Sequence, residues 1–292
     1  MKSSPQVVRV ELTGGLANQL FQWASGELAR RTVNARLELD GRIVDRPDGR
    51  GEQVSRLVPS AHVVGPSERE AAFWRNVHRH LPGPARGALK RTRRATFRLE
   101  RPKPVSTYEQ AVSALSDGDS VRMVGLFQNA ELLWGNKDLI QRDVAEGLRR
   151  HPTPVDRYSA VHVRRGDYVT VEKYRRMFGV CTPDYYRSAV RLLPQSLPVH
   201  VVSDDPDWAY SALTEGDTRV THAITVHRGN DHFQDLALLA GAENLVLSNS
   251  TFSWWGAYVS SAGTVISPEP WFSDSRRDRG LVGRNWVRLD RG

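Results

Sequence analysis

The chain has 292 residues, of which 39% are hydrophobic and 25% charged, a composition typical of a globular protein with one large domain or two smaller ones. Its 41 Lys and Arg against 33 Asp and Glu give a net charge of +8. One cysteine and no apolar run of about 18 residues exclude a disulfide framework, a cysteine-cluster metal site and a transmembrane helix, and the absence of an apolar signal core at the start leads us to expect a cytoplasmic protein.

The first 40 residues predict the start of an α/β unit. Residues 7–12 are rich in β-branched side chains and end at a Gly-Gly turn, as a strand does. In residues 16–28 the apolar side chains recur on one face of a 3.6-residue period, which indicates a helix. Residues 36–40 alternate again and predict a second strand.

Residues 69–103 form a strongly basic segment. It carries eleven Lys and Arg against two Glu, with three aromatic residues among them. The segment is either a solvated excursion of the N-terminal domain or a patch that meets anionic lipid or an anionic substrate. Nucleic acid is the weaker partner, because no motif for DNA or RNA binding accompanies the charge.

After residue 155 the pattern alternates between strands and helices. We predict strands at 158–163, 199–203, 220–226, 245–247 and 264–267, and helices at 183–193, from 206, at 232–240 and at 252–260. Such alternation favours a doubly wound parallel sheet. We therefore predict two α/β domains, residues 1–155 and 156–292, with ligands at the carboxyl ends of the strands.

The segment VHVRRGDY, residues 161–168, places unusual side chains at the end of a strand. His162, Arg164, Arg165 and Asp167 can converge there on an anion, and an arginine can grip a phosphate through two parallel hydrogen bonds. If the phosphate is a leaving group, the same arginine stabilises the developing charge. The alternative is a surface loop with an Arg–Asp ion pair.

The segment LSNSTFSWWGA, residues 247–257, runs from a strand through a hydroxyl-rich turn into a helix. The free N–H groups of a helix N-terminus, together with Ser250, Thr251, Phe252 and Ser253, can hold a phosphate. An ordinary helix cap is the alternative, because serine and asparagine are preferred capping residues. The two tryptophans that follow are more typical of core packing.

Two further segments follow strands. In VSDDPDW, residues 202–208, Asp204 and Asp205 could bind a ribose, a guanine edge or a metal, or simply cap a helix whose first residue is proline. The short acidic pattern of metal-dependent sugar transferases occurs here, but it is common by chance, and we expect no metal ion. In GGLANQLFQ, residues 14–22, Asn18 at the helix start can donate to a ligand or cap the helix. This segment is not the G-x-G-x-x-G fingerprint of dinucleotide-binding proteins.

Together and in this order, the segments GGLANQLFQWA, VHVRRGDY, VVSDDPDW and SNSTFSWWGAY resemble the alpha-1,2-fucosyltransferases of glycosyltransferase family 11. The resemblance extends across residues 7–268 and is weak over residues 41–120. Ala17 stands where the family usually has glycine, and alanine lacks the freedom of glycine at positive φ. Trp23 replaces the usual tyrosine.

The resemblance implies a GT-B type enzyme with two Rossmann-like domains facing a cleft. It implies an inverting, metal-independent transfer of L-fucose from GDP-fucose, without a further cofactor, to the 2-hydroxyl of a terminal galactoside. Carried over by residue, Arg164 binds the pyrophosphate, Asp204 or Asp205 contacts the nucleoside, Ser250 to Ser253 hold phosphate, and Asn18 reaches across from the N-terminal domain.

The chemistry agrees with this assignment. Fucosyl transfer passes through an oxocarbenium-like state while GDP leaves with negative charge, which Arg164 and the helix N-terminus at Ser250 can neutralise. Asp167 is our candidate for the general base, with His162 as a second candidate that can instead position Arg164.

Three alternatives stay open. The first is a related transferase with another nucleotide sugar or acceptor. The second is a non-catalytic, basic protein that keeps this scaffold and binds a surface, and the third is a nucleic-acid binder. The basic segment also suggests a peripheral protein at the inner membrane face that acts on a lipid-linked glycan.

Overall fold

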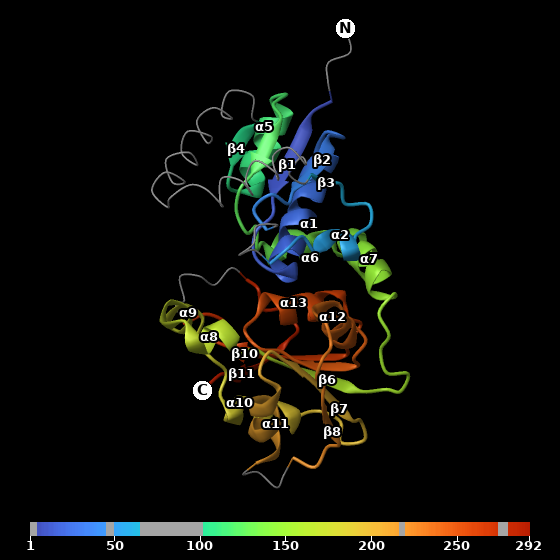
Figure 1. Cartoon of the computed structure of the whole chain (residues 1–292), viewed down its shortest axis with the longest axis vertical. Helices are drawn as coiled ribbons and strands as arrows, with labels where there is room; N and C mark the ends of the chain where they lie inside the picture. The colour runs from blue at the N-terminus through green and yellow to red at the C-terminus, as the bar shows by residue number, and fades with distance from the viewer. Residues whose placement is uncertain (1–4, 45–49, 65–101, 216–219, 274–279) are drawn as a thin grey trace, which may run out of the picture. The chain divides into compact units, whose positions relative to one another are not determined.

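The computed structural model describes residues 5–44, 50–64, 102–215, 220–273 and 280–292 (Figure 1). The chain divides into two compact units, Met1–Gln128 and Asn129–Gly292. The division comes earlier than the predicted boundary near residue 155. Most of the basic segment, residues 69–101, lies outside the described residues.

Two helices account for the earlier boundary. α6 (Ala130–Gly135) and α7 (Lys137–Leu148) precede the predicted linker, yet they pack within the second unit. The Tyr258 hydroxyl donates to the carbonyl of Leu133 at 2.9 Å, and the Gln141 amide donates to the carbonyl of Val259 at 3.1 Å. An apolar helix face must be buried somewhere, but its sequence does not say against which unit.

The first unit is built on five parallel strands in the order β3-β2-β1-β5-β4. They are β1 (Val7–Glu11), β2 (Arg36–Asp40), β3 (Val63–Val64), β4 (Lys103–Val105) and β5 (Val121–Met123). Its described helices are α1 (Leu16–Thr32), α2 (Val54–Leu57) and α5 (Tyr108–Ser116). The strand, helix and strand predicted for the first 40 residues are present, and β2 matches its predicted bounds.

Helix α1 approaches the sheet closely at Gly26. A Cβ atom at this position would lie 2.5 Å from Val10 Cγ2 and 2.9 Å from Leu37 Cδ1, which is closer than real Cβ contacts. Gly14 supplies the positive φ of the turn before the helix, at +76°. Ala17 lies inside α1 and is buried, so the turn does not need a glycine at that position.

The second unit is built on six parallel strands in the order β11-β10-β9-β6-β7-β8. They are β6 (Ser159–Val163), β7 (Val199–Ser203), β8 (Ile224–Val226), β9 (Asn244–Val246), β10 (Thr264–Glu269) and β11 (Val287–Asp290). Numbered within the unit, this is the order 3-2-1-4-5-6 of a Rossmann sheet. The predicted fold class, two Rossmann-like α/β domains of the GT-B type, is confirmed by the two parallel sheets.

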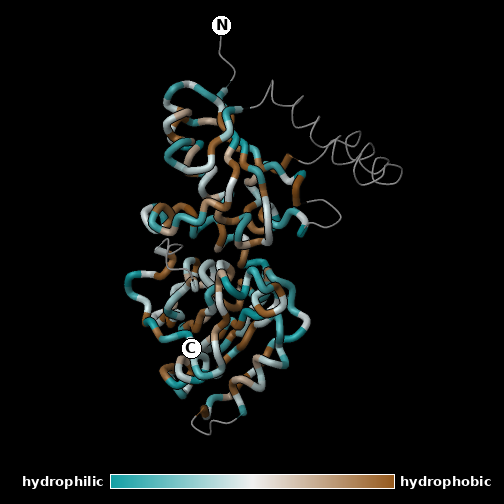
Figure 2. The backbone as a smooth tube through the Cα atoms, turned by 90° about the vertical axis from the view of Figure 1, so that its left-hand side faces the viewer, coloured by the Kyte–Doolittle hydropathy of each residue, from teal (hydrophilic) through white to brown (hydrophobic). Residues whose placement is uncertain are grey.

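Six further helices belong to the second unit: α8 (Gly166–Thr170), α9 (Glu172–Phe178), α10 (Pro183–Val190), α11 (Pro206–Thr214), α12 (His232–Ala240) and α13 (Thr251–Val259). α8, α9 and β11 were not predicted, and the strand predicted at 220–226 is shorter, as β8. Trp254, Trp255 and Tyr258 of α13 are buried and in edge-on or stacked contact, which confirms core packing for both tryptophans. Along both units hydrophobic stretches of chain alternate with hydrophilic ones (Figure 2).

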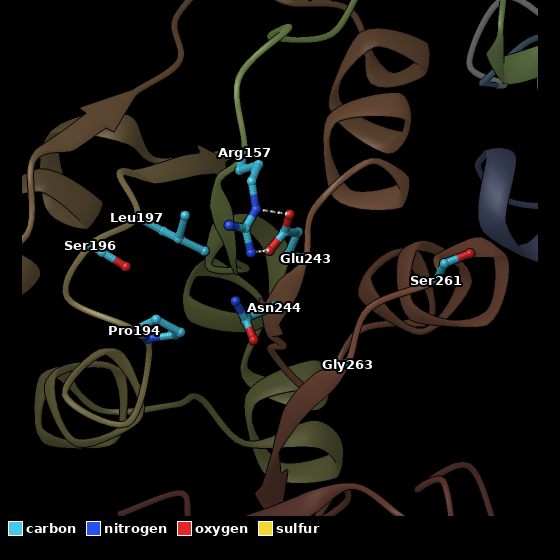
Figure 3. Close-up of a pocket in the computed structure, with 8 residues that line it drawn as sticks. All are labelled: Arg157, Pro194, Ser196, Leu197, Glu243, Asn244, Ser261 and Gly263. Carbon is cyan, nitrogen blue, oxygen red and sulfur yellow. Dashed lines mark hydrogen bonds and ion pairs between the residues drawn. The ribbon is translucent and has the colours of Figure 1, made fainter.

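A surface hollow of about 460 Å³ lies at the amino-terminal edge of the second sheet. Arg157 and Glu243 face each other there and are joined by hydrogen bonds of 2.5 and 2.7 Å (Figure 3). Open parallel sheets bind their ligands at the carboxyl ends of the strands, so this hollow is on the wrong edge for the predicted chemistry. None of the described helices is long and apolar enough to cross a membrane.

Gly26→Ala tests the close approach of α1. We expect it to lower the free energy of unfolding by about 1–3 kcal/mol, because a methyl group must displace Val10 or Leu37 in a packed core. Chemical denaturation measures the effect. Gly135→Ala is the matched control, since a Cβ there meets nothing within 4 Å, and it should be neutral or stabilising. Equal effects of the two substitutions would contradict the close packing.

Candidate active site

The carboxyl ends of β6, β7 and β9 bring most of the predicted residues together. β6 pairs with both β7 and β9, and the strand order reverses between β6 and β9. The Arg-Arg-Gly-Asp turn follows β6, the two aspartates follow β7, and the hydroxyl-rich turn follows β9. This switch point is where doubly wound sheets bind ligands.

Arg164 lies between two carboxylates. Its Nη2 donates to Asp167 Oδ1 at 2.5 Å, and its Nη1 lies 3.0 Å from Asp204 Oδ2. Burial opposes the charged form, but Asp204 and Asp167 outweigh it and raise the pKa of Arg164. Arg164 therefore carries a permanent positive charge at the end of β6.

Arg165 is held by a different pair of partners. Its Nε donates to Asp205 Oδ2 at 3.1 Å, and its guanidinium carbon lies 4.0 Å from the ring centroid of Trp208. Trp208 belongs to the first turn of α11, and Asp205 caps the same helix by accepting from the Trp208 backbone N–H at 3.3 Å. The predicted helix cap at Asp205 is thus present, and its second oxygen serves the arginine.

Asp204 fixes the turn between the two arginines. Its Oδ1 accepts from the Arg165 backbone N–H at 2.8 Å while its Oδ2 faces Arg164. Asp204 Oδ2 also lies closer to the Cβ position of Gly166, whose φ is +25°, than real Cβ contacts allow, so a side chain there would collide with the carboxylate. Both carboxylate oxygens of Asp204 are used within the protein, and its contact with a nucleoside stays a prediction.

His162 is buried beneath the turn. Its Nδ1 lies 2.8 Å from Ser248 Oγ and 2.7 Å from Ser253 Oγ, and the two hydroxyl oxygens are 2.9 Å apart. Burial first, and the nearby charge of Arg164 second, lower the pKa of His162 to about 3. His162 is therefore neutral, and through Nδ1 it joins β6 to the start of α13. Its predicted contact with the donor stays a prediction.

The hydroxyl-rich turn caps α13 as well as facing the switch point. Ser250 accepts from the backbone N–H of Phe252 at 3.2 Å, so the predicted cap is real. Ser250 and Ser253 are buried, whereas Thr251 and Phe252 are partly exposed. The helix presents its N-terminus at the carboxyl edge, where an anion is favoured.

Three residues of this region were missed at the sequence level. Asn249 is buried and its amide donates to the carbonyls of Phe178, Gly179 and Trp271, which fastens the ends of α9 and β10 to the hydroxyl-rich turn. Tyr168 stacks on Phe178, and its ring centroid lies 5.4 Å from the guanidinium carbon of Arg164. Trp208 supports Arg165. Only Trp208 had a usable signal, because it follows a helix cap by three residues and so faces back over it.

Asn18 belongs to the first unit. Its Oδ1 accepts from the Gln128 amide at 3.0 Å at the carboxyl edge of the first sheet. Two other α1 residues, both buried, form hydrogen bonds at the same edge. Gln22 accepts from the Thr13 backbone N–H and donates to the Gly125 carbonyl, and Gln19 donates to the Gly51 carbonyl. The role of Asn18 as a donor contact stays a prediction.

Acidic residues in the described part of the chain do not form a metal cluster: no group of three or more His, Cys, Asp or Glu there could hold an ion. The carboxylates of the site instead face arginines, as described above. Metal independence stays a prediction.

The family of the chain follows from its sequence match. The model of glycosyl transferase family 11 matches residues 120–290, more than half of the chain. The chain belongs to glycosyl transferase family 11. Three of the four segments lie within the matched residues, the predicted family is confirmed, and the protein is a glycosyltransferase.

Relatives in this family cover the chain to different extents. The alpha-1,2-colitosyltransferase of Escherichia coli is 28% identical and covers 98% of this chain and 99% of its own length. The O-antigen biosynthesis glycosyltransferase WbnK of Escherichia coli is 25% identical, with 95% and 99% covered. Galactoside 2-alpha-L-fucosyltransferase Sec1 of Mus musculus is 33% identical over 41% of this chain and 33% of its own.

Solved structures of glycosyltransferases are similar at low identity. The E. coli heptosyltransferase WaaC with ADP has a TM-score of 0.48 and 14% identity, with 98% of this chain and 93% of that chain covered. POFUT1 in complex with GDP-fucose has a TM-score of 0.48 and 13% identity, with 90% and 96% covered.

The buried His162 predicts a pH dependence of stability. The pKa of His162 in the folded chain is about 3, below the ordinary value of 6.5. Below pH 6.5 the unfolded chain therefore binds a proton at this residue and the folded chain does not. Stability should therefore fall as the pH drops, by about 2 kcal/mol from pH 7 to pH 5 for this group alone.

Chemical denaturation of the wild type and of His162→Gln at both pH values measures this contribution. The variant lacks the titrating group, so its stability should fall by about 2 kcal/mol less. Parallel pH profiles for the two proteins would contradict a buried, neutral His162.

Proposed function

We propose that this family 11 glycosyltransferase is an inverting, metal-independent enzyme that moves L-fucose from GDP-fucose to the 2-hydroxyl of a terminal galactoside. The observation that carries the proposal is the convergence of Arg164, Arg165 and the N-terminus of α13 at the switch point of the second sheet. Two fixed cations and a helix N-terminus suit the two phosphates of a nucleotide sugar.

The proposed reaction is a single displacement. The acceptor oxygen attacks the anomeric carbon of fucose from the face opposite GDP, while the bond from that carbon to the β-phosphate oxygen breaks. The bonding electrons leave with GDP, and the arginines stabilise the added negative charge. The acceptor proton passes to a general base.

Asp167 is the better of the two candidate bases. Its side chain is 30% exposed, and Arg164 engages only its Oδ1, so its other oxygen is available for an acceptor hydroxyl. His162 is buried, and its lowered pKa makes it a poor proton acceptor. We therefore assign His162 to positioning the start of α13 and keep Asp167 as the proposed base.

A second donor is favoured by one observation. The alpha-1,2-colitosyltransferase of Escherichia coli matches almost the whole chain, whereas the mouse fucosyltransferase Sec1 matches 41% of it. Colitose is L-fucose without its 3-hydroxyl. A site that hydrogen-bonds this hydroxyl would discriminate strongly against the deoxy sugar, and a site without such a partner would accept both.

The natural acceptor and the place of action are proposed from charge. The basic segment 69–103 would hold the enzyme at the anionic inner face of a membrane, where a lipid-linked glycan is the acceptor. A cytoplasmic enzyme that contacts the membrane peripherally fits this proposal.

A donor assay tests the proposed function. We expect GDP release from GDP-fucose that depends on lactose and persists in EDTA, with GDP-colitose measured in parallel. If GDP is released faster from GDP-colitose than from GDP-fucose, GDP-colitose replaces GDP-fucose as the proposed donor. No release from either donor, even with Mg²⁺ added, would contradict the activity and favour another nucleotide sugar or a non-catalytic protein.

Arg164→Ala tests the role of the charge at the end of β6. We expect transfer to fall by about two to three orders of magnitude and GDP affinity to fall with it, because a charge-assisted contact to the leaving phosphate is lost. Calorimetry measures the affinity. Arg157→Ala is the matched control at the opposite edge of the sheet, and it should leave both quantities unchanged. Unchanged GDP affinity in Arg164→Ala would reject the assigned role.

A further inference from the structure

We propose that Trp208 is a positioning residue that holds the Arg165 guanidinium flat, so that its outer edge meets the phosphates of the nucleotide. This inference rests on the proposed function, because it takes a nucleoside diphosphate as the ligand. In this proposal the Trp208 ring supports the phosphate site and does not contact the base of the nucleotide.

Trp208 and Asp205 both contact the Arg165 guanidinium. The Arg165 guanidinium carbon lies 4.0 Å from the indole centroid, and its Nε donates to Asp205 Oδ2 at 3.1 Å. An indole ring against the guanidinium carbon and a carboxylate bonded to Nε restrict the rotation of the group. Such contacts with tryptophan are the strongest cation–π pairs among the aromatic residues.

Trp208 is itself anchored in the core of the second unit. It packs against the apolar cluster between the sheet and α10 and meets the buried ring of Tyr186 edge-on, at 6.1 Å between centroids. Its backbone is fixed by the helix cap at Asp205. The support therefore does not move with the ligand, which is the condition for a preorganised charge.

Arg164 and Arg165 differ in how many of their terminal N–H groups already have a partner in the protein. Arg164 has a carboxylate at each terminal nitrogen, Asp204 at Nη1 and Asp167 at Nη2. Within the described residues, the terminal nitrogens of Arg165 make no hydrogen bond, and they are not among the buried polar atoms. The side chain is only 19% exposed, so these N–H groups form a narrow donor edge open to solvent.

This edge has the chemistry of a phosphate contact. A planar guanidinium donates two parallel N–H groups to two oxygens of one phosphate. A free arginine loses side-chain entropy when it binds, and an arginine already held by a ring loses less. Removal of the ring should therefore weaken the phosphate contact while every group that touches the ligand stays in the protein.

Calorimetry with three probes, GDP, guanosine and inorganic pyrophosphate, tests the inference on Trp208→Leu and Trp208→Phe. For Trp208→Leu we expect about a tenfold loss of affinity for GDP and for pyrophosphate, the range of a desolvated cation–π pair. Guanosine affinity should stay within about twofold of the wild type. Trp208→Phe keeps a ring under the guanidinium and should recover most of the loss.

A double-mutant cycle with Arg165→Ala shows whether Trp208 acts through the arginine. In that background Trp208→Leu should change GDP affinity by less than about twofold, because the group it positions is gone. Circular dichroism of each variant checks that the fold is kept. Undiminished loss in the Arg165→Ala background would overturn the inference.

The probes separate the possible failures. Loss of guanosine affinity in Trp208→Leu would overturn the inference and assign the ring to the base. A wild type that binds pyrophosphate but not GDP would reject the proposed donor, and the pyrophosphate comparison would still decide the role of Trp208. A wild type that binds none of the three probes would overturn both proposals.

Discussion

Two adjacent arginines at the end of β6 place like charges on neighbouring residues, and the rest of the site depends on how these charges are compensated. The compensation comes mainly from the next strand, where Asp204 and Asp205 follow β7. Val163 and Ser203 are paired in register, so the residues after them emerge side by side. The parallel register therefore places carboxylates beside both arginines, and these ion pairs hold the two charged guanidinium groups in position.

A neutral network on the other side of β6 complements this charged one. His162 joins Ser248 and Ser253, and the buried amide of Asn249 ties the adjacent loops. Because these groups are buried, each missing hydrogen bond would be costly, so the network specifies one position for the start of α13. The helix N-terminus and the arginines thus belong to one rigid edge of the sheet, which is what charge stabilisation in a transfer reaction requires.

Much of the fold was predictable because the strands and helices of the second unit carry clear periodicity. β7 and α12 match their predicted bounds, and the aspartates and hydroxyls fall at strand ends as expected. The division between the units was not predictable, because α7 buries an apolar face that either unit could have covered. α8 and α9 were also missed, since neither contains a buried residue and so neither has a periodic apolar face.

The sequence by itself determined the residue types of the site, their order and the strand ends that carry them, since these are local patterns of polarity and periodicity. Only the tertiary structure decided what each residue does. It turned His162 inward to two serines, closed Asp204 on the arginine turn, and set Trp208 beneath Arg165. These contacts join segments about 40 to 90 residues apart, and their partners are chosen by strand order and register, which no local pattern encodes.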